Sequence, residues 1–144
     1  IEAACAHFVR RPQSFDVICT TNMFGDILSD LASELSGSLG HAASLNAGDG
    51  VAMAQAQHGS ATDIAGKGIA NPASLIGSSG MLLNWLGNER QRADLADAGQ
   101  AISDALDATV ADPSTRTRDL GGTLDTHSFA KAVAANLRNL PLSG

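Results

Sequence analysis

The sequence predicts one α/β domain over residues 1–144, because short β-branched apolar runs alternate with longer segments of helical periodicity. The run FDVICT (residues 15–20) stands directly before a segment whose apolar residues recur at helical spacing. Two further extended segments flank the turn Gly48-Asp49-Gly50, and three helical segments follow Pro72. A chain of 144 residues can bury a core of its own, and no repeat or linker divides it.

The first part of the chain predicts a helix, a strand and a second helix. Residues 2–9 alternate Ala with larger apolar groups and stop before Pro12, as a helix does when it ends there. The short β-branched run at residues 15–20 predicts a buried strand. An amphipathic helix ending near Gly37 is then indicated by apolar residues at helical spacing, namely Phe24, Ile27, Leu28, Leu31 and Leu35.

The middle of the chain predicts two strands followed by a long loop. ASLNA (residues 43–47) and VAMAQA (residues 51–56) are short extended segments on either side of the glycine turn. HGSATDIAGKGIANP (residues 58–72) contains three glycines and little hydrophobic periodicity. A loop of this length inside a compact domain is usually either functional or disordered.

The last part of the chain predicts three helices. Pro72 suits the first turn of an apolar helix, and a second helix is expected over residues 89–109 with Leu95, Ile102 and Leu106 on its buried side. DPSTRTRDLGG is expected to form a loop. Thr126 is the expected N-cap of a final helix over residues 127–140.

Composition excludes several functional classes. The formal net charge is -6 and the nine Lys and Arg residues are scattered, which argues against a nucleic-acid-binding surface. No apolar run approaches the ~18 residues that cross a bilayer, and no N-terminal signal is present, so we expect no membrane association and a cytoplasmic location. Cys5 and Cys19 lack metal-binding spacing and are expected to be buried free thiols. Because the chain starts at Ile1 inside a helical pattern, we expect it to be part of a longer protein.

Asp26 and Asp30 stand four residues apart on the second predicted helix, where their side chains share one face. One interpretation is favourable interaction of the two acids with the positive N-terminus of that helix. The other is a divalent cation site, since Mg²⁺ and Mn²⁺ prefer carboxylate oxygens. A position just past the carboxyl end of a parallel strand would face the crevice where α/β proteins bind ligands. The pair alone leaves both interpretations open.

The loop at residues 58–72 lacks both the GxGxxG fingerprint and the GxxxxGK[ST] phosphate loop. It still offers an imidazole at His58, backbone N–H groups freed by glycine, and a carboxylate at Asp63 that could accept from two ribose hydroxyls. A lone His is more often structural than a ligand. Composition alone therefore does not establish a binding site here.

FDVICTTNMFGDILSDLASELSGSLG and HGSATDIAGKGIANP together closely resemble the β-decarboxylating dehydrogenases of the isocitrate/isopropylmalate dehydrogenase family. The resemblance covers nearly the whole chain and is nearest to the isopropylmalate/tartrate branch. It implies the family's three-layer α/β fold with a mixed sheet, of which this chain would supply the C-terminal part. It also implies a homodimer, with helices matching residues 2–9 and 24–36 packed across the subunit interface.

The resemblance implies that Asp26 and Asp30 bind Mg²⁺ or Mn²⁺. The family's third carboxylate, usually an Asp contributed by the other subunit, falls at Glu2 in IEAACAHFV. Glu is also a hard oxygen ligand, although it is longer by one methylene. The alternative for Glu2 is a solvated helix residue.

The resemblance also implies that residues 58–71 bind the adenosine half of NAD. His58 would lie against the adenine and Asn71 would hydrogen-bond its edge, while Gly59, Ser60 and Ala61 would line the nucleotide. Asp63 followed by Ile64 matches the NAD-preferring form, since a carboxylate accepts from ribose hydroxyls and repels a 2′-phosphate. The chain departs from the family at Thr62, where Pro is usual, and at residues 55–57, where Glu-Pro-Val is usual.

The implied activity is NAD-linked, metal-dependent oxidative decarboxylation of a 2-hydroxy diacid resembling isopropylmalate. Tartrate, malate or isocitrate are alternative substrates within the family, and an inactive nucleotide- and metal-binding fragment or a purely structural domain are alternatives outside catalysis. The family's acid and base are a Tyr and a Lys. This chain has no Tyr, and neither Lys67 nor Lys131 matches the family's motif for the catalytic Lys. No catalytic residue is therefore assigned, and both groups are expected in the missing half.

Overall fold

The structure, a computed structural model, describes residues 1–38 and 40–139. The chain divides into two compact units, residues 1–39 and residues 40–144. Each unit is described by itself below. The predicted single domain over residues 1–144 stays a prediction.

The first unit consists of two helices and a short 3₁₀ turn. Helix α1 (Glu2–Arg10) leads through η1 (Pro12–Ser14) and an extended segment to α2 (Asn22–Ser36). Phe8 of α1 and Leu28 of α2 are buried, and the rings of Phe8 and Phe15 lie 4.5 Å apart between centroids. Gly37 ends α2 with a positive φ of 140°, which glycine adopts without steric cost. Both predicted helices are confirmed.

The predicted strand at residues 15–20 is wrong for this structure. Within the described part of the chain this segment forms neither helix nor strand, it contains a bend at Asp16, and Val17 is 86% exposed. A strand needs a neighbouring strand to satisfy its backbone hydrogen bonds, and the sequence pattern of one segment does not show whether a neighbour is present. Asp26 therefore does not follow a parallel strand in this structure, and that part of the prediction is also wrong.

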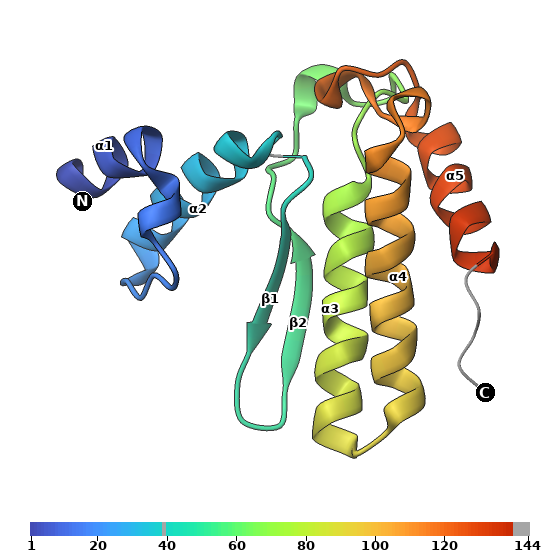
Figure 1. Cartoon of the computed structure of the whole chain (residues 1–144), viewed down its shortest axis with the longest axis horizontal. Helices are drawn as coiled ribbons and strands as arrows, with labels where there is room; N and C mark the ends of the chain where they lie inside the picture. Colours follow the sequence, from blue (N-terminus) through green and yellow to red (C-terminus); the bar gives the residue numbers. More distant parts are fainter. Residues whose placement is uncertain (39, 140–144) are drawn as a thin grey trace. The chain divides into compact units, whose positions relative to one another are not determined.

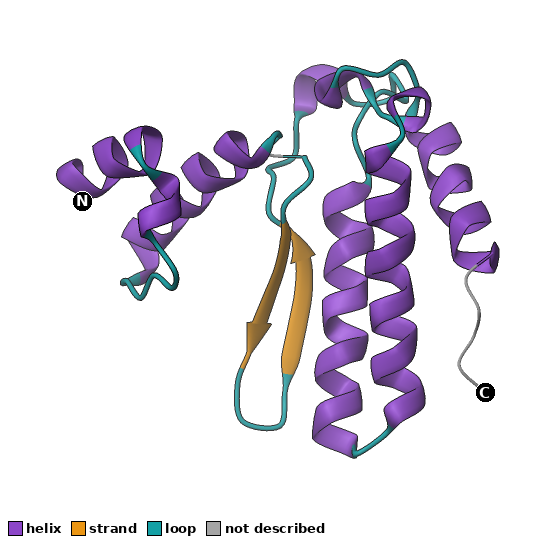
Figure 2. Cartoon of the chain, viewed as in Figure 1, coloured by secondary structure: helices purple, strands orange, loops and turns teal. Residues whose placement is uncertain are grey.

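The second unit starts with an antiparallel hairpin of β1 (Ala43–Ala47) and β2 (Ala52–Ala56), in which Leu45 pairs with Ala54. The hairpin packs on helix α3 (Ala73–Arg90), helix α4 (Ala93–Ala111) packs on α3, and α5 (Thr126–Asn139) packs on α4 (Figure 1). Figure 2 shows the β2–α3 and α4–α5 connections at one end of the helices, and the β1–β2 turn and the α3–α4 connection at the other. The predicted hairpin, loop and three helices are confirmed as elements.

The core of this unit lies between α3, α4 and α5. Its buried residues are Ala73, Ala105, Leu106, Phe129 and Val133. Small residues bring α3 and α4 close together, since a Cβ at Gly99 would lie 2.6 Å from the carbonyl oxygen of Gly80. The boundary predicted at Glu89 is wrong: residues 89 and 90 still belong to α3, and Gln91 adopts a left-handed conformation (φ 53°) that ends it.

Two local predictions are corrected at the end of the chain and at the cysteines. Asp125, not Thr126, caps α5, because its carboxylate accepts from the backbone N–H of Ser128 at 2.7 Å. The predicted last helical residue, Leu140, lies outside the described residues. Cys5 and Cys19 are both free, but Cys19 is exposed, so the predicted burial is wrong for that thiol. None of the described helices has the length and apolar character that a membrane crossing requires.

Candidate functional site

Asp26 and Asp30 are both exposed and lie one turn apart on α2. Because α2 begins at Asn22, neither acid belongs to its first turn. The favourable effect of a helix N-terminus on an acid falls off within that turn. The helix-terminus interpretation of the pair therefore loses its physical basis. Two carboxylates on one helix face remain a donor set that suits a hard divalent cation.

Glu2 is the first residue of α1 and is exposed. Among residues 1–38 and 40–139, no three His, Cys, Asp or Glu side chains are grouped closely enough to hold a metal ion. The structure thus describes the Asp26/Asp30 pair without a third ligand beside it. The assignment of Glu2 as a ligand from another subunit stays a prediction.

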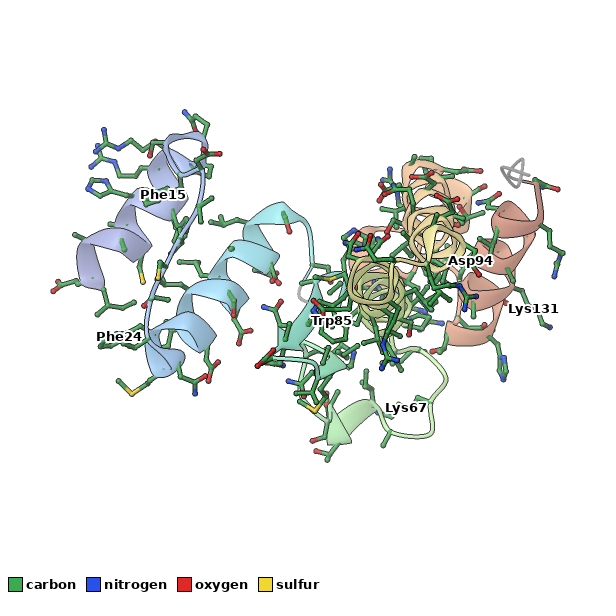
Figure 3. All side chains as sticks on the ribbon, turned by 90° about the horizontal axis from the view of Figure 1, so that it is seen from below. Phe15, Phe24, Lys67, Trp85, Asp94 and Lys131 are labelled. Carbon is green, nitrogen blue, oxygen red and sulfur yellow. The ribbon has the colours of Figure 1, made fainter. Side chains whose placement is uncertain are left out.

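The loop at residues 57–72 is built from tight turns. Ala61 and the glycines Gly66 and Gly68 all have positive φ, and Thr62–Ile64 form the single 3₁₀ turn η2. A Cβ at Gly59, Gly66 or Gly68 would meet no atom within 4 Å, so this side of the loop is open. Figure 3 shows Lys67 on the loop, apart from Trp85 on α3. Such an open, glycine-rich backbone allows a ligand to approach closely.

The side chains predicted to bind nucleotide lie along this loop in one continuous stretch. His58 is half-buried, and its Nδ1 lies 2.9 Å from the carbonyl oxygen of Gly59. Because a carbonyl can only accept, Nδ1 is the donor in this contact. Ser60, Ala61 and Asp63 are exposed, and Ile64 is half-buried. Asp63 sits in η2, where its carboxylate is open to a ligand.

Asn71 differs from the rest of the loop because it is only 7% exposed and its side chain already has two partners. Its Oδ1 accepts from the N–H of Ala73 at 2.9 Å, which satisfies a free donor at the start of α3. Its Nδ2 donates to Oδ2 of Asp119 at 2.8 Å. Asn71 therefore links the loop, the start of α3 and the segment at Asp119. The sequence predicted a contact of Asn71 with adenine and did not predict this structural role.

Sequence reasoning missed several residues that hold the loop and the adjoining hairpin. Ser74 and Ser78 are fully buried on α3, and their hydroxyls accept from the N–H groups of Gln57 (3.0 Å) and Ser44 (2.9 Å), respectively. Asp119 contacts Asn71, and Thr126 contacts the end of the loop. Asp119 could have been noticed as an acid inside the glycine-containing loop DPSTRTRDLGG, and Thr126 was predicted only as a helix cap.

Comparison with known proteins identifies the family. A profile of the isocitrate/isopropylmalate dehydrogenases matches residues 1–133. The isocitrate/homoisocitrate dehydrogenase of Thermus thermophilus is 46% identical over 140 residues, which cover 97% of this chain and 40% of that protein. The 3-isopropylmalate dehydrogenase of Archaeoglobus fulgidus is 45% identical over 137 residues, covering 95% of this chain and 40% of that protein. The chain belongs to the isocitrate/isopropylmalate dehydrogenase family.

The fold agrees with this assignment. The crystal structure of a β-decarboxylating dehydrogenase from Thermococcus kodakarensis is similar with a TM-score of 0.78 and 40% identity, over 96% of this chain and 39% of that one. The predicted α/β fold of the isocitrate/isopropylmalate dehydrogenase type is confirmed. The chain spans about two fifths of the length of the relatives that it matches.

Proposed function

We propose that this chain serves as the nucleotide- and metal-binding part of an NAD-dependent dehydrogenase that oxidatively decarboxylates a 2-hydroxy diacid resembling isopropylmalate. The observation that carries the proposal is that this member of the family has two acidic features, the Asp26/Asp30 pair on α2 and Asp63 in the loop. Both are exposed and therefore available to ligands. Tartrate, malate and isocitrate are the alternative substrates.

Asp26 and Asp30 would hold Mg²⁺ or Mn²⁺, with Glu2 of a second subunit as the third carboxylate. When bound, the ion supplies Lewis-acid polarisation of the substrate's hydroxyl and carboxylate oxygens. The two aspartates are ligands and not proton carriers in this proposal. Their spacing of one helical turn fixes both carboxylates on the same side of α2.

The loop at residues 58–71 would bind the adenosine half of NAD. The exposed carboxylate of Asp63 can accept hydrogen bonds from ribose hydroxyls, and it repels the 2′-phosphate of NADP. The bound cofactor supplies the hydride acceptor. The ring of His58 would then lie against the adenine, and the open backbone at Gly59 would let the nucleotide approach closely.

A homodimer belongs to this proposal. The first unit exposes the large apolar residues Ile1, Val9, Val17, Ile18, Met23, Ile27 and Leu35. Apolar groups gathered in so short a stretch of chain are typical of a surface covered by another protein. We infer that a second copy covers this surface and brings its Glu2 to the metal. A cytoplasmic location also belongs to the proposal, and the two free thiols support it.

Turnover tests the proposal at the level of the longer protein. With Mn²⁺ and NAD⁺, that protein should form NADH from one of isopropylmalate, isocitrate, homoisocitrate, tartrate or malate. The 144-residue chain contains no Tyr to serve as the family's acid, so it should form none above background under the same conditions. A longer protein that turns over none of these substrates would contradict the dehydrogenase assignment and leave nucleotide and metal binding without catalysis.

A further inference from the structure

We propose that the segment 112–126 is the support of the nucleotide-binding loop, and that Asp119 and Thr126 are positioning residues for NAD. This inference rests on the proposed function, because it concerns the same loop. It adds to that function two residues outside the loop and the way in which they act. Figure 1 shows the two segments side by side at one end of α3 and α4.

Three hydrogen bonds join the end of the loop to this support. Nδ2 of Asn71 donates to Oδ2 of Asp119 at 2.8 Å, across 48 residues of sequence. The N–H of Thr126 donates to the carbonyl oxygen of Gly68 at 2.9 Å. The hydroxyl of Thr126 donates to the carbonyl oxygen of Ala70 at 2.5 Å. The backbone N–H and the side-chain hydroxyl of Thr126 thus bind two neighbouring carbonyls of the loop, those of Gly68 and Ala70.

Few other hydrogen bonds connect the loop to the rest of the second unit. Within the described chain, the hydrogen bonds of residues 58–67 are internal to the loop, such as that from the N–H of Ile64 to the carbonyl oxygen of Ala61 at 3.0 Å. Its entry is held at Gln57, whose N–H donates to the hydroxyl of Ser74. Its exit is held by Asp119 and Thr126. The proposed nucleotide-binding residues therefore lie between an entry and an exit that are each fixed by hydrogen bonds.

The support itself is tightly built. The Arg116 guanidinium donates to the carbonyl oxygens of Val110 (2.6 Å) and Ala111 (3.1 Å), which closes the end of α4. The N–H of Leu124 donates back to the carbonyl oxygen of Arg116 at 3.0 Å. Gly122 has no room for a side chain, because a Cβ there would collide with the backbone of Arg116. A residue placed on such a segment holds its partner in one position.

The expected consequence is preorganisation. Ordering a loop when a ligand binds lowers the affinity, and a loop that is already held loses less. The three hydrogen bonds keep Gly68, Ala70 and Asn71 in their bound arrangement before NAD arrives. Removing one of them should weaken NAD binding by the equivalent of one hydrogen bond, about fivefold.

The test compares three variants of the full 144-residue chain. Thr126→Val removes the hydroxyl but keeps the β-branched shape, and Thr126→Ser restores the hydroxyl. Thr123→Val makes the same chemical change in the same segment at an exposed residue whose side chain has no hydrogen bond within the described part of the chain. Each variant is measured for amide hydrogen exchange at residues 59–70 without nucleotide and for NAD⁺ affinity by calorimetry.

Thr126→Val should speed exchange in the loop and raise the Kd for NAD⁺ about fivefold, while Thr126→Ser and Thr123→Val should match the unaltered chain in both. Unchanged exchange in Thr126→Val would overturn the proposal, and so would faster exchange with unchanged affinity. If the unaltered chain bound no NAD⁺, the proposed function would fail, whereas the anchoring would still be judged by exchange alone.

Discussion

At the scale of single residues, the interpretation of Asp26 and Asp30 depends on where α2 begins. The sequence placed both acids near a helix start and left two explanations open. The structure starts α2 at Asn22, which puts Asp26 and Asp30 beyond the first turn. The positive helix N-terminus acts within that turn, so it does not offset the mutual repulsion of two carboxylates on one helix face. A cation between them would offset that repulsion.

Substitution of the pair tests this interpretation. Asp26→Asn and Asp30→Asn should each weaken Mn²⁺ binding to the chain by about tenfold, the equivalent of one charge-assisted contact. Asp16→Asn removes an exposed carboxylate outside α2 and serves as the matched control. Calorimetric titration with Mn²⁺ alone measures the three affinities. Equal losses in all three variants would indicate general attraction of cations to an acidic chain and would contradict a site at α2.

At the scale of elements, α5 is started by Asp125 and its stability should depend on pH. Hydrogen bonds from the Ser128 backbone N–H and then from its hydroxyl lower the pKa of Asp125. A carboxyl whose pKa is lower in the folded chain adds stability above its unfolded pKa of about 3.9, and that stability is lost as the pH falls through the folded pKa.

Asp125→Asn should therefore leave the urea midpoint at neutral pH nearly unchanged, because Asn caps a helix as well as Asp does. Below about pH 4 its midpoint should fall less steeply than that of the unaltered chain. Asp125→Ala should lower the midpoint at every pH, since it removes the cap. If Asp125→Asn showed the same acid dependence as the unaltered chain, the cap would not be the titrating group.

The α3–α4 contact makes a second prediction at this scale. A Cβ at Gly99 would lie 2.6 Å from the Gly80 carbonyl oxygen and 2.8 Å from the Asn84 backbone N. Gly99→Ala should therefore lower the free energy of unfolding by about 1–3 kcal/mol, even though Ala is the better helix former. The neighbouring exposed Gln100→Ala should change it by less than about 0.5 kcal/mol. A stabilised Gly99→Ala variant in urea unfolding would mean that helix propensity outweighs the close contact.

How far the sequence predicts the elements depends on how local their causes are. The α2 helix and the β1–β2 hairpin follow from periodicity and from a glycine turn, both of which lie within the segment itself. The strand expected at residues 15–20 depends on a partner strand, and the described chain pairs none with it. In the same way, the sequence predicts that residues 58–72 form a loop, whereas Asp119 reaches Asn71 only because the fold joins positions 48 residues apart.

At the scale of the whole molecule, the exposed apolar surface of the first unit predicts self-association. Leu35 on α2 and Leu75 on α3 are exposed to similar extents, 45% and 55%. Leu35→Lys should weaken dimerisation at least about tenfold, since it would bury a charge in the proposed interface. Leu75→Lys, in the second unit, is the matched control and should leave dimerisation unchanged. Sedimentation equilibrium measures both, and a chain that stays monomeric or responds equally to the two changes would contradict the proposed interface.

The most direct test of the central claim is calorimetric titration of the chain with NAD⁺ and NADP⁺, before and after Asp63→Ser. The claim is that this family member binds NAD through residues 58–71 and selects it by the Asp63 carboxylate. NAD⁺ should bind more tightly than NADP⁺ to the unaltered chain, and Asp63→Ser should reduce that preference about tenfold or more by removing the repulsion of the 2′-phosphate. Tighter binding of NADP⁺, or a preference that Asp63→Ser leaves unchanged, would contradict the claim.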